Sequence, residues 1–289
     1  MQKYSIFNLI KNAFSGHQNW DLAWKDPTPK KEYDVVIIGG GGHGLATAYY
    51  LAKEHNITNV AIIEKGWIGG GNVGRNTTII RSNYMHDDNA LFSEFGMDLW
   101  RKMSQDLNYN VMFSPRGIIN LAHSDAQMNV FARRGNSMRL NGIDAVLLNR
   151  EEVKEIIPMA DFSDNVRFPI FGGLMQPSAG TARHDAVAWG YARQADSMGV
   201  DIIQNCEVTG FDVVSGKIQG VRTSRGDIKV KKIGLCVAGS TNILAEKLNM
   251  TLPIETHLLQ ACVSEPVKPV LDRVVTFGAG HFYISQSDK

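Results

Sequence analysis

A glycine-rich turn constrains the fold of this chain more than any other segment. The turn reads GGGGHG at 39–44, a β-branched run at 33–38 precedes it, and 45–55 repeats apolar residues at helical spacing. Glycines with this spacing let a chain turn tightly after a strand, approach a pyrophosphate and pack the next helix closely. We therefore predict a βαβ unit whose helix N-terminus binds phosphate. Five residues of the turn are assigned to a cofactor site: Gly39, Gly41, Gly42, His43 and Gly44.

An acidic residue supports this prediction. A second apolar run at 59–63 ends at Glu64, twenty residues after Gly44. A carboxylate at this position hydrogen-bonds ribose hydroxyls and repels a 2′-phosphate, which disfavours NADP. The unit by itself does not distinguish FAD from NAD.

A second glycine-rich loop, from Gly66 to Arg75, follows the acidic residue directly. Its small residues permit close backbone approach, and its polar side chains offer donors to a phosphate or a flavin ring. NAD-binding folds have no such loop at this position, so the loop favours FAD. A flexible surface loop is the alternative. The residues assigned to the cofactor here are Gly71, Asn72, Arg75, Asn76 and Thr77.

The remaining pattern predicts an α/β protein in two lobes. Helices are expected over 87–107, 124–141 and 183–198, and strands at 117–121, 201–204, 208–214, 218–223, 228–230 and 233–237. We assign Val208, which opens this meander, to the cofactor site as well. Such an order indicates a Rossmann-like FAD-binding lobe that is discontinuous, with an inserted α+β substrate lobe built on a mostly antiparallel sheet.

The predicted lobes have definite bounds. An N-terminal arm covers 1–32, the FAD-binding lobe 33–105 and 176–248, and the substrate lobe 106–175 and 249–289. In the arm, apolar residues at 6, 9, 10 and 14 mark one stripe of a short helix. The chain ends inside an expected hairpin, which predicts that the substrate lobe is incomplete at its C-terminus.

Composition excludes several classes of protein. The 30 basic and 29 acidic residues give a net charge of +1, which argues against nucleic acid as a partner. The apolar stretch 35–52 contains five glycines, so we expect no membrane span. The 3 cysteines are too few for a disulfide framework and indicate a reducing cytoplasm. The histidines lack the spacing of metal ligands, and no metal site is expected.

Two segments carry a resemblance to a known family. GGGGHGLATAYYLAKEHNITNVAIIEKGWIGGGNVGRNTTIIRSNY, from residue 39, and GTARHDAVAWGYAR, from residue 180, resemble glycine- and D-amino-acid oxidase-like flavoproteins. Among these, the likeness is to the β subunits of heterotetrameric sarcosine oxidases. It extends over essentially the whole chain.

The resemblance implies a definite chemistry. A noncovalent FAD oxidises sarcosine (N-methylglycine) to an imine and glycine, and a second flavin, FMN, is attached covalently to a histidine. Electrons pass from FAD to FMN and on to oxygen, which yields hydrogen peroxide. The implied partners are alpha, gamma and delta subunits, with tetrahydrofolate on one of them to accept the one-carbon unit.

The flavin-bearing histidine of the family corresponds to His184. Either Thr181 or Gly180 is expected to cap the helix, which places His184 in its first turn. The positive end of a helix disfavours imidazolium and so keeps the ring neutral and nucleophilic. Arg183 is a candidate partner of the FMN phosphate, although a solvated arginine is the alternative.

The candidate catalytic residue is Arg81. It matches an arginine that binds the substrate carboxylate in single-chain relatives, and a guanidinium holds a carboxylate through two parallel hydrogen bonds. A surface or intersubunit salt bridge is the alternative. Thr78 stands where those relatives carry an arginine over the flavin, so their mode of FAD attachment is not transferred.

Three other functions compete with the oxidase prediction. An NAD-dependent dehydrogenase is disfavoured by the loop at 66–75 and by the split second lobe. A different FAD-dependent amine or amino-acid dehydrogenase subunit shares every motif described. A flavin-binding fragment without activity is the third.

Overall fold

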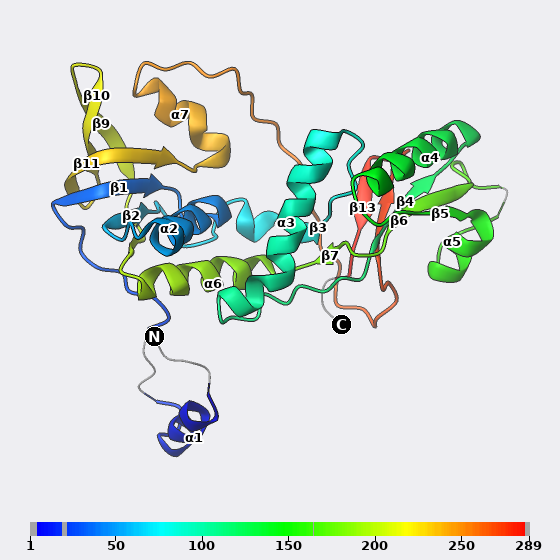
Figure 1. Cartoon of the computed structure of the whole chain (residues 1–289), viewed down its shortest axis with the longest axis horizontal. Helices are drawn as coiled ribbons and strands as arrows, with labels where there is room; N and C mark the ends of the chain where they lie inside the picture. Colours follow the sequence, from blue (N-terminus) through cyan, green and yellow to red (C-terminus); the bar gives the residue numbers. More distant parts are fainter. Residues whose placement is uncertain (1–4, 19–21, 164, 287–289) are drawn as a thin grey trace. The chain divides into compact units, whose positions relative to one another are not determined.

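The chain forms two compact units in the computed structural model, which describes residues 5–18, 22–163 and 165–286 (Figure 1). Unit 1 consists of Met1–Asn76, Leu107–Asn110 and His184–Ala261. Unit 2 consists of Thr77–Asp106, Val111–Arg183 and Cys262–Lys289. Each unit is therefore assembled from three separate stretches of the chain.

The boundaries of these units differ from the predicted lobes. The sequence assigned 77–105 and 176–183 to the FAD-binding lobe, whereas the structure places both in unit 2. The cause is strand pairing: β3 (Ile79–Ile80) pairs antiparallel with β7 (Gly180–Thr181). Two residues cannot show a strand pattern in a sequence, so this ladder was not predicted. Residues 249–261 likewise join unit 1 instead of the second lobe.

Unit 1 is built on a six-stranded sheet in the order β8-β2-β1-β11-β10-β9. The bounds are β1 Glu32–Ile38, β2 Val60–Ile63, β8 Asp201–Ile203, β9 Val208–Val214, β10 Lys217–Thr223 and β11 Gly226–Leu235. Strands β8, β2, β1 and β11 run parallel, and β10 and β9 continue the sheet as an antiparallel meander. The predicted Rossmann-like α/β fold of this lobe is thus confirmed.

Strand β11 corrects one expectation. The sequence suggested two strands, at 228–230 and 233–237, whereas the structure has one strand of ten residues. Its first residues pair with β10, and Lys229–Leu235 pair with β1. Lys231 and Lys232 interrupt the apolar pattern, but their exposed side chains leave the backbone ladder intact.

Unit 1 also contains helices (Figure 1). They are α1 Ile6–Phe14, α2 Gly42–His55, η1 Val73–Arg75, α6 His184–Ser197, η2 Ala238–Ser240 and α7 Thr241–Glu246. Helices α2 and α6 pack against each other, with the Tyr49 and Tyr191 rings 5.3 Å apart and edge to face. Helix α2 ends where Asn56 adopts a left-handed conformation, with φ of 54°.

Unit 2 contains a five-stranded sheet in the order β13-β12-β4-β6-β5. Its strands are β4 Ile118–Ala122, β5 Val146–Asn149, β6 Gly172–Gln176, β12 Val274–Phe277 and β13 Phe282–Ile284. Only β12 and β4 pair in parallel, so the sheet is mostly antiparallel as expected. The helices are α3 Asp87–Asp106, α4 Asp125–Leu140 and α5 Arg150–Ile156.

The sheet of unit 2 is covered on both faces. Leu174 packs with Met138 of α4, whereas Ile119 and Leu121 pack with Val153 of α5. Because side chains of a strand alternate between the faces, α4 and α5 cover opposite sides of the sheet. Among the described residues, no helix is long and apolar enough to cross a membrane.

Candidate functional site

The glycine turn after β1 contains two kinds of glycine. Gly39 has φ of +109°, and a Cβ there would lie 2.3 Å from the carbonyl oxygen of Cys236. A Cβ on Gly44 would lie 2.0 Å from the carbonyl oxygen of Gly39. Both distances are far below van der Waals contact, so these two glycines are required by the fold of the turn itself.

Gly41 and Gly42 are not crowded by the protein. The nearest atom to a Cβ on either of them is Cγ2 of Val73, at 3.7 Å and 3.6 Å. Gly41 is the N-cap of α2, and no side chain caps the helix there. The first N–H groups of α2 thus lie at the positive end of the helix without a capping side chain, an arrangement that fits a pyrophosphate. His43 lies in this first turn with its side chain exposed.

Glu64 is held against the turn by the backbone. Its Oε2 accepts a hydrogen bond from the Gly40 N–H at 2.8 Å, and its Oε1 accepts one from the Gly66 N–H at 2.9 Å. Each carboxylate oxygen keeps a second lone pair. The carboxylate thus lies at the carboxyl end of β2 with acceptor capacity for ribose hydroxyls.

The second glycine-rich loop is ordered by its own hydrogen bonds. The Gly69 N–H donates to the Gly40 carbonyl at 3.0 Å, which ties the two glycine-rich segments together. Arg75 Nη1 donates to the Gly70 carbonyl and Asn76 Nδ2 to the Val73 carbonyl. These contacts contradict the flexible-loop alternative.

The same contacts redefine the roles of the loop residues. One donor of Arg75 and one of Asn76 hold the loop itself and are not available to a ligand. Gly71 and Asn72 are exposed at the outer end of the loop, and a Cβ on Gly71 would meet no atom within 4 Å. A ligand could therefore approach the backbone of the loop at these two residues.

Val208, which was assigned to the cofactor site, begins β9. Its side chain is buried in the core of unit 1 with Cys206 and Phe211. Only its main chain is therefore available to a cofactor.

Thr77 and Thr78 belong to unit 2. The Thr77 hydroxyl donates to the Tyr283 hydroxyl at 3.0 Å. Thr78 has φ of 64°, a left-handed conformation that is unfavourable for a β-branched residue. Its carbonyl accepts a hydrogen bond from the Ala182 N–H, so the β3–β7 ladder holds the strained conformation in place.

His184 is the first residue of α6, as predicted. Its Nδ1 is buried and has no hydrogen-bond partner among the described residues. The expected cap is wrong: Thr181 belongs to β7, where its hydroxyl accepts a hydrogen bond from Arg116 Nη2 at 3.2 Å. Arg183 directly precedes the helix instead, and its N–H donates to the Val111 carbonyl.

Arg81 follows β3 and is partly buried. Its Nη1 donates to Asn83 Oδ1 at 2.6 Å, and its guanidinium lies over the Tyr84 ring, 4.7 Å from the centroid. Within the described part of the chain, Arg81 forms no ion pair with a carboxylate. The salt-bridge alternative therefore finds no support inside this subunit.

Sequence reasoning missed two neighbours of Arg81. Asn83 is fully buried, and Arg134 of α4 donates from Nη2 to the Asn83 carbonyl oxygen. Arg134 is one of several arginines on a predicted amphipathic helix, and nothing in the sequence distinguishes it from exposed Arg133.

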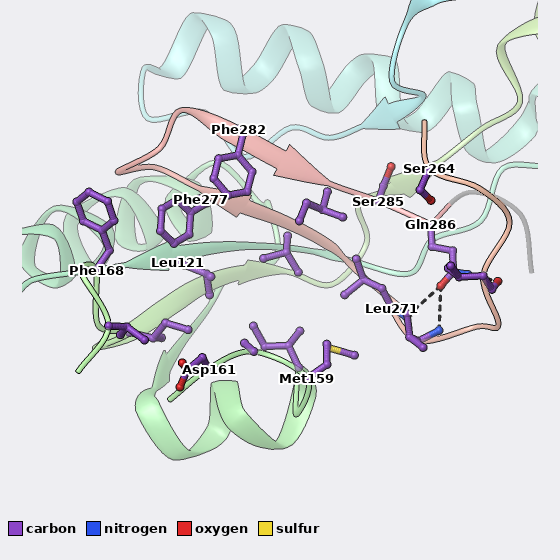
Figure 2. A pocket seen from close by; sticks show the side chains of 18 of the residues that line it. Leu121, Met159, Asp161, Phe168, Ser264, Leu271, Phe277, Phe282, Ser285 and Gln286 are labelled. Carbon is purple, nitrogen blue, oxygen red and sulfur yellow. Dashed lines mark hydrogen bonds between the residues drawn. The ribbon is translucent and has the colours of Figure 1, made fainter. Parts of the chain in front are cut away.

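A separate cavity of about 600 Å³ lies in unit 2 (Figure 2). Most of its wall is apolar, with Leu121, Leu271, Phe277 and Phe282 among the lining residues. Gln286 closes one end, where its Oε1 accepts from the Val270 and Leu271 N–H groups. The cavity is on the α5 side of the sheet, and Asp161 and Arg167 are the charged residues in its otherwise mostly apolar lining. We do not assign it to catalysis. Among the described residues, no cluster of histidine, cysteine or acidic side chains could hold a metal ion.

The βαβ unit, the Glu64 carboxylate at the end of β2 and the hydrogen-bonded second loop together define a dinucleotide-binding flavoprotein fold. A family model described as FAD dependent oxidoreductase matches residues 34–289. The chain belongs to this family.

Individual relatives narrow the comparison. The chain is 60% identical to the sarcosine oxidase subunit beta of Rhizobium meliloti over 99% of its own length and 69% of the relative's. It is 52% identical to the subunit of the same name from Rhodobacter capsulatus, over 100% of this chain and 70% of that one. A solved structure of L-proline dehydrogenase from P. horikoshii has a TM-score of 0.77 and 26% identity, covering 89% of this chain and 68% of that one.

Proposed function

We propose that this chain is the amine-oxidising flavoprotein subunit of a sarcosine oxidase. The observation that carries the proposal is the glycine turn, where Gly41 and Gly42 would accept a Cβ without a clash in front of an uncapped helix N-terminus. A side chain would be tolerated there by the protein itself, so the space is best explained by a bound pyrophosphate. The relatives named sarcosine oxidase subunit beta support the choice of substrate.

The FAD-binding residues lie in unit 1. The α2 N–H groups would hold the pyrophosphate, and Glu64 would hold the ribose. The Gly69–Arg75 loop, tied to Gly40, would approach the cofactor through its backbone. We propose that this FAD is noncovalent.

Arg81 would bind the substrate carboxylate. Its remaining N–H donors match the two oxygens of a carboxylate, and no acidic side chain among the described residues occupies them. A carboxylate fixed in this way orients the N-methyl group of sarcosine for oxidation. When bound, FAD supplies an acceptor for the hydride equivalent lost from that methyl group.

His184 would carry a covalent FMN. A ring nitrogen must be accessible to attack a flavin methyl group, and His184 is the first residue of α6. Because Nδ1 is buried, we propose Nε2 as the point of attachment. Arg183, the preceding residue, would contribute a cation toward the FMN phosphate.

The complete enzyme would contain alpha, gamma and delta subunits as partners. In this proposal electrons leave through FMN to oxygen and form hydrogen peroxide, and the imine passes to tetrahydrofolate on a partner subunit. The name subunit beta of the relatives supports a multisubunit assembly. Three unpaired cysteines, Cys206, Cys236 and Cys262, support a reducing cytoplasm as the compartment.

A reduction experiment tests the activity. The purified chain should be yellow, and sarcosine added without oxygen should bleach its FAD absorbance near-completely. Arg81→Ala should raise the half-saturating sarcosine concentration by about 30-fold or more, as loss of a charged bidentate contact costs about 2–4 kcal/mol. L-Proline is the comparison substrate, because a proline dehydrogenase shares the fold. Faster bleaching by L-proline, or no bleaching by sarcosine, would refute the assigned substrate.

A second experiment tests the covalent flavin. Acid-precipitated protein from the native host should retain yellow flavin, and the tryptic peptide 184–193 should gain the mass of FMN. His184→Ala should lose this flavin but keep its FAD. Retention of the acid-stable flavin in His184→Ala would contradict the assignment.

A further inference from the structure

We infer that Arg134 and Asn83 form one carboxylate-binding site together with Arg81. The ligand would be the carboxylate of a small amino acid. In naming sarcosine as that amino acid the inference rests on the proposed function, whereas the anion site rests only on the geometry of unit 2.

The three residues are joined through Asn83. Arg81 donates to its side-chain oxygen at 2.6 Å, and Arg134, which is 51 residues further along the chain, donates to its backbone carbonyl. The two guanidinium groups therefore bind the two acceptors of one residue. Tyr84 packs beneath Arg81, with its ring 4.7 Å from the guanidinium carbon. This packing restricts the orientation of the Arg81 side chain.

The neighbouring segment is held rigidly. The Ser82 N–H donates to Gln176 Oε1, and Gln176 Nε2 donates back to the Ser82 hydroxyl at 2.7 Å. Ser82 and Gln176 are both fully buried. Residues 81–83 are thereby fixed against β6, on the face of the sheet that α4 covers.

Two buried donors in this cluster lack acceptors. Asn83 is fully buried, and its Nδ2 has no hydrogen-bond partner among the described residues. The Nε atom of Arg134 is also buried and likewise has none. A buried donor without an acceptor costs about 1–3 kcal/mol, and more when it is charged. An oxyanion would supply acceptors to the cluster.

The cluster also lacks a counter-ion. Neither Arg81 nor Arg134 forms an ion pair with an acidic side chain in the described parts of the chain. Burial and the neighbouring Arg81 cation lower the pKa of Arg134, which shows that its charged form is poorly compensated. A bound anion would remove both the repulsion and the unmet hydrogen bonding.

A carboxylate fits these donors in charge and shape. Guanidinium and amide N–H groups bind a planar oxyanion through paired hydrogen bonds. Arg134 would then share with Arg81 the task of holding the substrate carboxylate. The second cation explains how a small amino acid with few other contacts is retained.

Acetate binding to the purified 289-residue chain tests the inference, with saturation-transfer NMR of the acetate methyl group as the readout. Wild-type protein should bind acetate, and acetamide should not compete. Arg134→Met and Arg81→Met should each weaken acetate binding by at least tenfold. The matched control is Arg133→Met, which removes the exposed neighbouring arginine and should bind as wild type does.

Asn83→Asp provides a second test that does not depend on removing a cation. The new carboxylate should act as an internal counter-ion, raise the melting temperature and abolish acetate binding. Arg134→Lys, which keeps the charge and loses the planar fork, replaces Arg134→Met if that variant fails to fold by circular dichroism. Unchanged acetate affinity in the folded Arg134 variant, a lower melting temperature in Asn83→Asp, or stronger competition by phosphate than by formate would overturn the inference.

The test separates this inference from the proposed function. If acetate binds as expected but sarcosine does not reduce bound FAD, the anion site stands and the proposed substrate fails. If sarcosine reduces FAD in Arg134→Met with an unchanged half-saturating concentration, the proposed function stands and the role of Arg134 is refuted.

Discussion

At the residue scale, neighbouring glycines of one turn serve different purposes. Gly39 and Gly44 are glycine because the backbone of the turn leaves no room for a Cβ. Gly41 is uncrowded, and its glycine leaves space for a ligand. The sequence pattern is the same in each case, so only the surrounding atoms separate a requirement of folding from a requirement of binding.

This difference predicts opposite phenotypes for two similar substitutions. Gly44→Ala should lower the free energy of unfolding by more than about 3 kcal/mol, because the methyl group collides with a carbonyl oxygen of the turn. Gly41→Leu should fold normally and lose FAD. Urea unfolding and the FAD content of the purified protein measure the two effects.

Gly96 provides the control for these variants. It lies in α3 with no atom within 4 Å of a Cβ position, so Gly96→Leu should retain both fold and FAD. Full FAD occupancy in Gly41→Leu would show that the pyrophosphate binds elsewhere.

Tyr33 predicts an alkaline loss of stability. Burial raises the pKa of Tyr33. The Asp201 carboxylate raises this pKa further, because it accepts a hydrogen bond from the Tyr33 hydroxyl at 2.8 Å. The neutral form is thus favoured in the folded protein, so its stabilising effect is complete below the unfolded-state pKa near 10 and is lost as the pH rises above it.

Tyr33→Phe should therefore destabilise most at neutral pH. We expect a loss of about 1–2 kcal/mol at pH 7, because two hydrogen bonds of the hydroxyl disappear. The difference in unfolding free energy between Tyr33→Phe and wild type, measured by urea titration, should become smaller from pH 10 to pH 12. Parallel curves over that interval would mean that the hydroxyl titrates alike in both states.

At the element scale, local sequence signals explain the starts of several helices. Helix α5 begins with a capping box, in which Asn149 Oδ1 accepts from the Glu152 N–H and Glu152 Oε2 accepts from the Asn149 N–H. Helix α2 begins at a glycine without such a cap. Of these two helices, only α2 therefore has first-turn N–H groups that no capping side chain binds and that a ligand could bind.

Asn149→Ala should destabilise unit 2 by about 1 kcal/mol, since it removes the acceptor for the Glu152 N–H. The measurement is the urea midpoint followed by circular dichroism. Glu151→Gln removes the other acidic charge of the first turn of α5 and leaves the capping box intact. It should change the free energy of unfolding by less than about 0.5 kcal/mol. Equal losses in both variants would assign the effect to helix charge instead.

At the scale of the whole molecule, helix α1 contributes no buried residue to unit 1. Helix α1 has a strongly amphipathic sequence and a Ser5 cap, yet none of its residues is buried. Its apolar side chains, Phe7 and Phe14 among them, are exposed. Helix α1 therefore contributes little to the stability of unit 1.

Two leucines test this conclusion. Leu45 of α2 is 0% exposed, and Leu45→Ala should cost about 2–5 kcal/mol of unfolding free energy. Leu9 of α1 is 64% exposed, and Leu9→Ala should change it by less than about 0.5 kcal/mol. A large loss of unfolding free energy in Leu9→Ala would show that helix α1 packs against the rest of the protein in solution.

The sequence by itself determined the βαβ unit, the position of Glu64 after its second strand and the presence of His184 in the first turn of α6. These features depend on residues near one another in the chain, where glycine spacing and apolar periodicity leave few alternatives. The predicted fold class included the mostly antiparallel second sheet, although only its strand at 117–121 and a C-terminal hairpin were located in the sequence. The β11 strand was divided wrongly because exposed lysines on a paired strand have the same pattern as a turn.

Only the tertiary structure decided where the units divide and what surrounds Arg81. The β3–β7 ladder joins residues about a hundred positions apart. Arg134 donates a hydrogen bond to Asn83, which lies 51 positions earlier in the chain. Such contacts depend on which faces of a sheet its strands and helices share. No local pattern distinguishes Arg134 from Arg133 one residue away, because their difference lies in burial and hydrogen bonding, which exist only after the chain has folded.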